Sequence, residues 1–375
     1  MKRTILLTLV LCLLMSSVSC GSSDNQESTA EIRKIGITLS AGDDSICRDL
    51  GETLSKAIDE LSNEKTLYKV NMIDASRSAN GQCNHVDLFV SSGYDTIIVD
   101  LIDEAKAYDI AKIAVQNGVN VVFTGRTYPE EMTEQIYDEV RSAVDEEIEF
   151  ENACREQLSA LRDTSGVYGK VLLGAVYCAG KQNAARLVEP GRISYIGYYA
   201  PLIGQGFADI MDSLPLGGDI DGSGSIEYAV ISAGKETPNS KPAMNHMTEI
   251  LNEKGVASGK VKTIAANDRE SAVESLNKIL ASNDPPDIVF AMSDEALDYA
   301  DEALTSQEMK AGKDIHLIAV SSGMVDLSGK IPDLLSGAVI CNTTVLAEKI
   351  AQAVKGYEDG TENGGAEYLD IGLVY

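Results

Sequence analysis

The chain has 375 residues, a formal net charge of −27 at neutral pH and no tryptophan. This strongly acidic balance argues against nucleic acid and anionic membrane surfaces as partners, because both are bound through basic faces. Roughly 345 residues follow the amino-terminal segment described next, which is more than one hydrophobic core usually spans. We therefore expect two domains.

Residues 1–20 have the pattern of a secretion signal, with two basic residues, an apolar run over 5–15 and small residues before Cys20. The apolar run is too short to span a bilayer. Because Ser17-Val18-Ser19-Cys20 resembles a bacterial lipobox, we expect an extracytoplasmic protein anchored to the bacterial cell membrane by a lipidated Cys20. The alternative is a cleaved signal peptide followed by a coincidental cysteine. Residues 21–32 are polar and predict a flexible tether.

From Lys34 onward, short apolar runs alternate with helical periodicity. We expect strands over 35–39, 68–73, 96–99 and 119–123, and helices over 47–61, around 86–91 and over 105–117. This alternation predicts a parallel, doubly wound α/β sheet. Ligands of such sheets bind beyond the carboxyl ends of the strands. The polar residues at those ends are Asp43, Asp44, Asp74, Asp100 and Arg126.

The repeat is interrupted over about 130–190 by an acidic, helix-rich segment that we interpret as an insertion. It resumes with a strand over 193–197. The following helices are expected over 204–214, 244–254, 269–281, 295–304 and 345–357, and the strands over 228–231, 261–265, 287–291, 316–320 and 339–340, with a closing strand over 368–374. Residues 33–197 and 198–342 then form two lobes, 343–365 returns to the first, and 366–375 closes the chain.

Residues 219–227, Asp-Ile-Asp-Gly-Ser-Gly-Ser-Ile-Glu, have the spacing of a calcium-binding loop. Such loops take oxygen ligands from positions 1, 3, 5, 7 and 9 and place glycine at position 6. Those positions hold Asp219, Asp221, Ser223, Ser225 and Glu227, with Gly224 at the turn. The usual carboxylate at position 12 is missing, so the last ligand must come from elsewhere in the chain. A turn rich in Asp, Gly and Ser that binds no metal is the alternative.

The order of elements resembles that of type I periplasmic sugar-binding proteins, and most of all their galactose/glucose-binding branch. The segments that carry the resemblance are 34–38 followed by Asp43 and Asp44, 96–103, 121–123, 195–197, 250–255, 287–291 and the loop 219–227. The resemblance implies two α/β lobes joined by a three-segment hinge. It also implies that Asp287 supplies the missing carboxylate of an all-oxygen, structural Ca²⁺ site.

In the sugar pocket the chain departs from that branch. The resemblance places Asp44, Asp100, Thr237, Asn239, Asn267, Ser293 and Ser321 at ligand positions, with Ile46, Ala243 and Cys341 at others. Several are smaller or less polar than the residues of the branch, so we expect a rebuilt pocket instead of ordinary glucose or galactose recognition. Tyr198 and Tyr199 are candidate stacking platforms or hinge residues, and Tyr128 is a further platform. Arg126 is either a pocket residue or the partner of an acidic surface group, and Asp43 with Asp44 could equally cap a helix.

The sequence favours a monomeric solute-binding protein that closes two lobes on a sugar or a sugar-like small polar ligand and delivers it to an ABC permease. The alternative is a sensor that presents its bound state to a chemoreceptor or a histidine kinase. An enzyme is not expected, because His85, His246 and His316 lie near no other candidate catalytic group in the sequence. Five cysteines follow Cys20, and either Cys154 pairs with Cys178 or all are free thiols.

Overall fold

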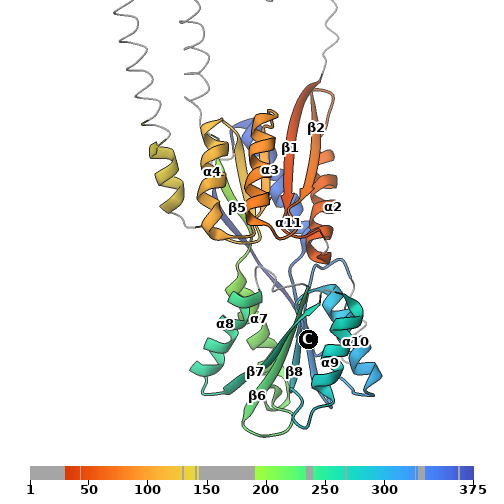
Figure 1. Cartoon of the computed structure of the whole chain (residues 1–375). Helices are drawn as coiled ribbons and strands as arrows, with labels where there is room; N and C mark the ends of the chain where they lie inside the picture. Colours follow the sequence, from red (N-terminus) through yellow and green to blue (C-terminus); the bar gives the residue numbers. More distant parts are fainter. Residues whose placement is uncertain are drawn as a thin grey trace, which may run out of the picture.

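The computed structural model describes residues 30–42, 44–128, 131–139, 142, 191–233, 240–266, 268–325, 327, 334–361 and 364–375. They form two lobes, each built on a six-stranded sheet with helices on both faces (Figure 1). The expected α/β architecture of two doubly wound lobes is confirmed. Within the described residues, no helix combines the length and apolar character needed to cross a membrane.

The amino-terminal lobe contains a wholly parallel sheet with the strand order β11-β5-β4-β3-β1-β2. Its strands are β1 (Glu31–Leu39), β2 (Thr66–Asp74), β3 (Thr96–Asp100), β4 (Asn120–Thr124), β5 (Ile193–Tyr198) and β11 (Gly365–Leu369). Its helices are α2 (Ser45–Asp59), α3 (Ala79–Ser91), α4 (Ala107–Gln116) and α11 (Thr343–Asp359), with a short 3₁₀ turn η1 (Glu104–Lys106). Residues 131–139 form a further helix beside this lobe.

Helices cover the two faces of this sheet in pairs. The helix α2 buries Leu50, Leu54 and Ile58, which recur at helical spacing, and it packs beside α11 on one face. On the other face, α3 and α4 pack against a separate core that contains Phe89 and Phe123. The parallel strands are therefore buried on both sides, as their almost continuous apolar sequences require.

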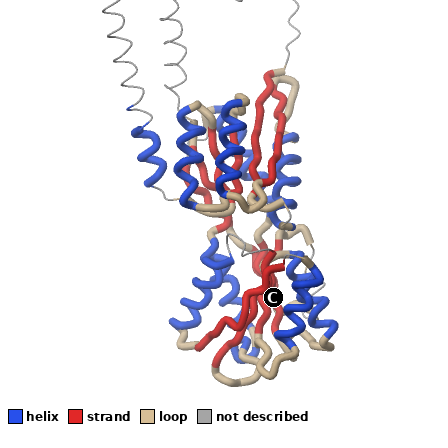
Figure 2. The backbone as a smooth tube through the Cα atoms, in the orientation of Figure 1, coloured by secondary structure: helices blue, strands red, loops and turns tan. Residues whose placement is uncertain are grey.

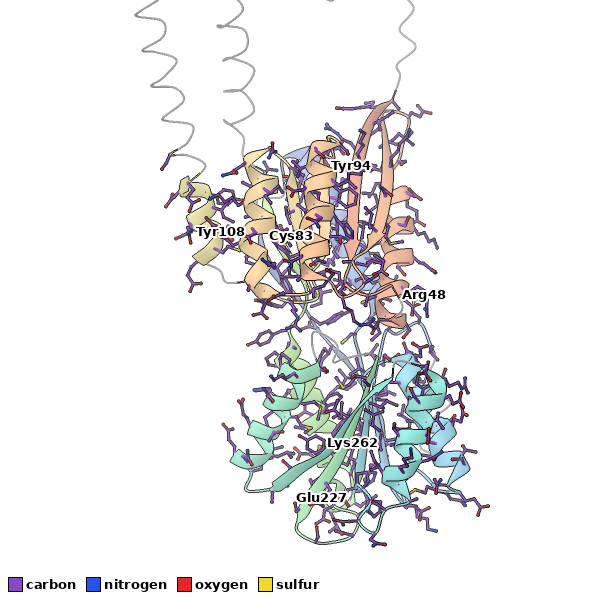
Figure 3. All side chains as sticks on the ribbon, in the orientation of Figure 1. Arg48, Cys83, Tyr94, Tyr108, Glu227 and Lys262 are labelled. Atoms are coloured by element: carbon purple, nitrogen blue, oxygen red, sulfur yellow. The ribbon has the colours of Figure 1, made fainter. Side chains whose placement is uncertain are left out.

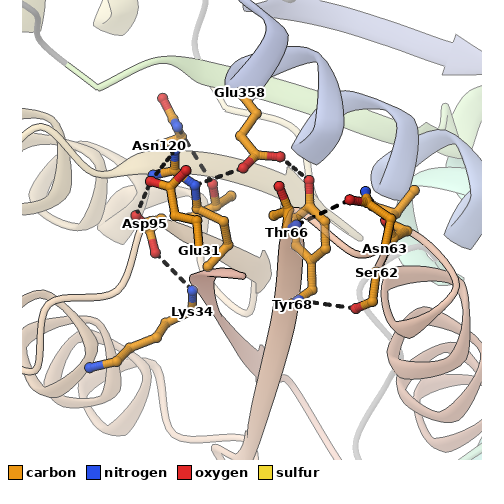
Figure 4. A network of polar contacts seen from close by, with 12 residues as sticks. Glu31, Lys34, Ser62, Asn63, Thr66, Tyr68, Asp95, Asn120 and Glu358 are labelled. Atoms are coloured by element: carbon orange, nitrogen blue, oxygen red, sulfur yellow. Dashed lines mark hydrogen bonds and ion pairs between the residues drawn. The ribbon is translucent and has the colours of Figure 1, made fainter. Parts of the chain in front are cut away.

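A polar network fastens the returning helix α11 to the amino ends of the strands (Figure 4). The Arg33 guanidinium on β1 donates to Glu358 of α11 at 2.7 Å and to Asp95 at 3.2 Å. The Tyr68 hydroxyl on β2 donates to the same Glu358 carboxylate. These contacts place α11 in the amino-terminal lobe, although the strand before it belongs to the other lobe.

The carboxy-terminal lobe has the strand order β12-β10-β9-β8-β6-β7. Helices flank its strands on both sides (Figure 2). Its strands are β6 (Ser225–Ala233), β7 (Ala257–Ala266), β8 (Ile288–Ala291), β9 (His316–Ser321), β10 (Gly337–Ile340) and β12 (Gly372–Val374). Its helices are α7 (Ala200–Ser213), α8 (Ser240–Glu253), α9 (Arg269–Leu280) and α10 (Asp294–Ser306), with a 3₁₀ turn η3 (Pro215–Gly218). The pair α7 and α8 covers one face, and α9 and α10 cover the other.

The chain crosses between the lobes after β5, after β10 and between β11 and β12. The end of the chain forms two strands instead of the single closing strand expected over 368–374. Leu369 ends β11 in the amino-terminal sheet, and Gly372 begins β12, which pairs antiparallel with β10 in the other sheet. The expectation was wrong because Leu369, Ile371 and Leu373 alternate as in one strand, although the backbone passes from one lobe to the other at Asp370 and Ile371.

Candidate ligand-binding site

A cavity of about 110 Å³ lies between the lobes, where the carboxyl ends of their strands face each other. Its lining residues come from both lobes and from the crossings: Asp44, Ile46, Cys47, Leu50, Asp100, Thr124, Gly125, Tyr198, Ile203, Met292, Val320, Cys341, Thr343 and Leu346. This is the position at which doubly wound sheets bind ligands. It is therefore the candidate site of this chain.

Asp100, the last residue of β3, is a buried acid of the cavity. Its Oδ2 accepts hydrogen bonds from the Ser40 backbone N–H at 3.0 Å, the Ser40 hydroxyl at 2.5 Å and the Cys47 thiol at 3.4 Å. Burial nevertheless raises the pKa of Asp100, because the charged carboxylate is desolvated. Its Oδ1 has no hydrogen-bond partner among the described residues and stays available to a ligand.

Gly125 makes room for this free oxygen. A Cβ atom at position 125 would lie 2.3 Å from Asp100 Oδ1, which is far closer than two such atoms can approach. The φ angle of Gly125 is also +76°, in the left-handed region that favours glycine. The turn after β4 thus leaves one side of the Asp100 carboxylate open to the cavity.

Asp44 occupies the N-cap position of α2 and also lines the cavity. Its Oδ1 accepts from the backbone N–H groups of Ile46 at 2.9 Å and Cys47 at 3.2 Å, while Oδ2 has no partner in the described part of the chain. Burial raises the pKa of Asp44, and the nearby charge of Asp100 acts in the same direction. The capping role and the pocket position therefore coexist in one side chain.

Thr124 supplies a third polar atom on the same wall. It ends β4, is 1% exposed, and its Oγ1 has no hydrogen-bond partner among the residues that the structure describes. A buried hydroxyl without a partner is costly, so such groups are usually satisfied by water or by a ligand. Asp44, Asp100 and Thr124 bring this unsatisfied hydrogen-bonding capacity to one side of the cavity.

The lining residues that the carboxy-terminal lobe contributes are mostly apolar: Ile203 from α7, Met292 after β8 and Val320 of β9, together with Cys341 after β10. Thr343, the first residue of α11, adds a hydroxyl beside them. Burial raises the pKa of the Cys341 thiol to about 12, so this side chain is a neutral, weakly polar group. At the hinge, the Tyr198 hydroxyl donates to the Asn342 carbonyl at 2.9 Å and presents its ring to the cavity.

Other predicted ligand residues lie outside the cavity lining. The Ser293 hydroxyl accepts from the Ala296 N–H as the N-cap of α10, and the Ser321 hydroxyl accepts from the Gly323 N–H. Tyr199 is 44% exposed, and its ring packs edge-on against Tyr368.

Two further predicted residues of the amino-terminal lobe, Arg126 and Tyr128, are not among the residues that line the cavity. Arg126 is half-buried, and its Nε has no hydrogen-bond partner among the described residues. Its positive charge favours the ionised form of Asp100 and so opposes the effect of burial on the pKa of that carboxyl. Tyr128 packs against Phe123. The remaining predicted residues lie outside the described part of the chain: Thr237, Asn239, Asn267, Asp43, Cys154, Cys178 and Cys20, together with most of the insertion.

Several lining residues were not among the predicted ones, notably Thr124, Met292 and Val320. Each lies at or just beyond the carboxyl end of a strand. The rule that selected Asp100 would have found them if it had been applied to apolar and hydroxyl side chains as well as to charged ones.

The loop 219–227 gathers acidic side chains at the other end of the carboxy-terminal sheet. One carboxylate oxygen from each of Asp219, Asp221 and Asp287 lies within 4.8 Å of the others. Asp287 precedes β8 and accepts from the Ile220 N–H and the Glu227 N–H, each at 2.9 Å, so it joins both ends of the loop. Glu227 lies far from the cleft, whereas Arg48 of α2 lies beside it (Figure 3).

The loop geometry fits an oxygen-coordinated cation. Gly224 has a φ angle of +85° at the sharp turn, and its N–H donates to Asp219 Oδ2 at 2.8 Å. The Ser223 hydroxyl donates to the Ser225 carbonyl at 3.0 Å, so two further predicted oxygen ligands lie side by side. The donor set contains oxygen only, which suits Ca²⁺ better than zinc or copper.

Comparison with known proteins gives a consistent structural result. No family model matches the chain, and no curated protein matches its sequence. Among solved structures, the periplasmic binding component of the arabinose ABC transporter from Shewanella sp. ANA-3, bound to L-arabinofuranose, superposes with a TM-score of 0.62 at 13% identity over 91% of both chains. The chain has the fold of type I periplasmic sugar-binding proteins.

Two further structures show the same fold. A protein from Mycobacterium smegmatis in complex with β-D-fucofuranose matches with a TM-score of 0.62 at 14% identity over 91% of both chains. The fructose-binding periplasmic domain of a hybrid two-component system matches with a TM-score of 0.61 at 13% identity, over 91% of this chain and 90% of that one. These likenesses concern the fold, and the expectation that the chain is not an enzyme stays a prediction.

Proposed function

We propose that the protein is an extracytoplasmic, lipid-anchored solute-binding protein that captures a sugar or a sugar-like small polar ligand and delivers it to an ABC permease. The observation that carries this proposal is a set of polar atoms lining the cavity for which the described residues show no hydrogen-bond partner: Asp44 Oδ2, Asp100 Oδ1 and Thr124 Oγ1. Carboxylate oxygens accept hydrogen bonds strongly from ligand hydroxyls, which sugars present in number.

Lobe closure explains how binding becomes a signal for transport. The cavity takes its walls from both lobes, so a ligand there makes contacts that favour the closed arrangement. A permease that distinguishes closed from open lobes then receives only loaded protein. The arabinose transporter component with the same fold supports this role.

The test of binding is isothermal titration calorimetry of the mature chain with a panel of monosaccharides, sugar alcohols and sugar derivatives. The variant Asp100→Asn removes the buried charge, whereas Asp103→Asn changes an exposed aspartate three residues later and serves as its control. We expect at least one compound to bind the wild type and the control, and to bind Asp100→Asn at least about tenfold more weakly. Absence of binding by every compound would contradict the proposal.

A sensor is the second candidate function, because the fructose-binding neighbour belongs to a two-component system. In this case the closed lobes would be recognised by a chemoreceptor or a histidine kinase instead of a permease. Uptake of the labelled ligand in cells with and without the gene separates the two roles. Unchanged uptake after deletion would favour the sensor and count against transport.

The lipid anchor is part of the same proposal and rests on the sequence Ser17–Cys20. We expect the full-length protein to incorporate labelled palmitate and to partition into the detergent phase of Triton X-114. Cys20→Ala should remove both properties, while Cys47→Ala, which changes a cysteine of the cavity, should leave them unchanged. Equal labelling of Cys20→Ala and the wild type would refute the anchor.

Calcium is the proposed structural ion of the loop 219–227. Asp219, Asp221, Ser223, the Ser225 carbonyl, Glu227 and Asp287 would hold it, and it would neutralise carboxylates that otherwise lie close together. The ion would hold the start of β6 to the start of β8. Its position at the far end of the lobe makes a direct contact with the cleft ligand impossible (Figure 3).

A further inference from the structure

One serine hydroxyl connects carboxylates of the two lobes where the lobes meet. Ser322 follows β9 in the carboxy-terminal lobe and is 0% exposed. Its Oγ lies 2.6 Å from Asp294 Oδ2 of α10, in the same lobe, and 3.4 Å from Asp49 Oδ2 of α2, in the amino-terminal lobe. Asp294 Oδ2 also accepts from the Ser322 backbone N–H at 2.9 Å. Asp49 and Asp294 therefore face each other across the lobes through a single hydroxyl.

The hydrogen count of this contact is incomplete while Asp49 is ionised. A hydroxyl has one hydrogen and two lone pairs. The hydrogen of Ser322 is directed to Asp294 Oδ2, because that oxygen is much nearer than Asp49 Oδ2. One lone pair accepts from the Met324 backbone N–H at 3.3 Å. The second lone pair can accept a hydrogen from Asp49, and an ionised carboxylate has none to donate.

We propose that Asp49, Ser322 and Asp294 form a proton-operated latch, in which protonation of Asp49 favours the closed arrangement of the lobes. Asp49 Oδ2 takes a proton from the solvent and donates it to Ser322 Oγ, while Ser322 continues to donate its own hydrogen to Asp294 Oδ2. The O–H bond formed on Asp49 is the one covalent change. This inference deepens the proposed function, on which its consequence for ligand capture rests, because a larger closed fraction raises the apparent affinity.

The charges around Asp49 come from both lobes. Arg48 and Glu52 lie on α2 itself, whereas Asp294 belongs to α10 of the other lobe. Among the other elements that pack against α2, β2 ends at Asp74, whose carboxylate accepts from backbone N–H groups of nearby turns. The charged residues of β1 lie at its amino end, and the first turn of α11 carries no charge. Arg48 and Glu52 stay beside Asp49 whether the lobes are open or closed, so Asp294 is the charge that closure brings near.

Closure and protonation are therefore linked. Burial raises the pKa of the Asp49 carboxyl, and the negative charge of Asp294 acts in the same direction, while Ser322 and Arg48 oppose them. Opening the lobes separates Asp49 from Asp294 and returns it to water, where a carboxyl has a pKa of about 3.9. The closed lobes thus bind the proton more tightly than the open lobes, and closure becomes more favourable as the pH falls from neutral.

The experiment counts open and closed molecules of the mature, ligand-free chain by single-molecule energy transfer. One dye is attached through an unnatural amino acid to an exposed residue of each lobe. Asp49→Asn imitates the protonated side chain, because its amide N–H can donate to Ser322 Oγ. At pH 7 we expect its ratio of closed to open molecules to exceed that of the wild type about fivefold, the effect of one net hydrogen bond.

The matched control is Asp59→Asn, which removes the same charge from the exposed last residue of α2 and should keep the wild-type ratio. An Asp49→Asn ratio equal to or below that of the wild type would overturn the inference, as would an equal rise in Asp59→Asn. No sugar is present in this experiment. Its failure therefore leaves the binding proposal intact, and a failed sugar screen leaves the latch standing.

Two further comparisons separate the latch from a general effect of charge. In a Ser322→Ala background the gain from Asp49→Asn should shrink, because the amide has lost its acceptor. Unfolded chains give a separate transfer efficiency and are not counted. An undiminished gain would overturn the role of the hydroxyl.

Acidification from pH 7 to pH 5 provides the last comparison. It should raise the closed fraction of the wild type and reduce the advantage of Asp49→Asn over it. Asp44 and Asp100 of the cleft titrate in both proteins, so they do not create this difference between them. An advantage that stays constant or grows as the pH falls would also overturn the inference.

Discussion

The molecule carries two groups of acidic side chains, and their surroundings are opposite in kind. Asp44 and Asp100 lie buried at the cleft, where desolvation raises the pKa of both carboxyls. Asp221 in the loop 219–227 is exposed, and the backbone N–H of Ser223 lowers its pKa. Aspartate side chains at the cleft therefore keep oxygens that a ligand can reach, whereas those in the loop are hydrogen-bonded to the backbone of the loop itself.

This difference shows which of the two acidic groups gains more free energy from forming new hydrogen bonds. At the cleft, a ligand finds carboxylate oxygens that have already lost water and still lack partners, so each new hydrogen bond is a net gain. At the loop, backbone donors already satisfy much of the acidic charge, and a cation adds order to a turn that is formed without it. Variants that exchange or remove these properties test the comparison.

The largest expected effect comes from Gly125→Ala at the cleft. The new methyl group would collide with Asp100 Oδ1, and the left-handed backbone would add strain. We expect ligand affinity to fall about 100-fold in calorimetry, since a charged hydrogen bond is lost and its partner displaced. Gly93→Ala is the matched control, with a φ angle of +69° and open space around the added atom. If both variants lose affinity equally, the contact with Asp100 is not the reason.

The next effect concerns the loop and calcium. At a Ca²⁺ concentration 100 times the dissociation constant, binding stabilises the folded state by about 2.7 kcal/mol, which raises Tm by several degrees. Asp219→Asn and Asp287→Asn should each abolish this rise in a thermal melt with and without EDTA. Asp284→Asn, an exposed aspartate just before β8, should keep it. A wild-type melt that EDTA leaves unchanged would contradict the calcium proposal.

The buried charge of Asp100 predicts a pH-dependent change in stability. Burial raises the pKa of the folded carboxyl above its unfolded value of about 3.9, so the charged form costs stability at neutral pH. This cost disappears as the pH falls below the unfolded value. Asp100→Asn should therefore gain free energy of unfolding relative to the wild type at pH 7, measured in urea, and the gain should shrink toward pH 4. A gain that grows as the pH falls would show that burial is not the dominant effect.

The smallest effect is expected at the hinge. Tyr198→Phe removes the hydroxyl that donates to the Asn342 carbonyl across two chain crossings. The loss should be about 1 kcal/mol of unfolding free energy, the usual net value of one hydrogen bond. Tyr199→Phe is the control, because its hydroxyl has no hydrogen bond to a described residue and its ring contact with Tyr368 is kept. Equal losses would assign the effect to the rings and not to the hinge bond.

The sequence predicts the fold more readily than the cleft, because the alternation of apolar runs with helical periodicity indicates the two lobes. The proposed ligands from Asp219 to Glu227 stand at alternate positions of one short segment, so their spacing alone suggests a cation site, and this site stays a prediction. The cleft is assembled from many distant segments, and the strand-end rule finds Asp100 but does not say which neighbours join it. Whether the Ser293 hydroxyl faces a ligand or caps α10 depends on a local backbone donor that no periodicity reveals.

The separation of β11 from β12 also constrains how the protein is made. Residues 365–369 complete the edge of the amino-terminal sheet, and residues 372–374 complete the edge of the other. During synthesis on the ribosome, both sheets remain one strand short until this segment has emerged, however early the other strands were made. Each lobe must therefore wait with an unprotected sheet edge, and the same short segment closes both.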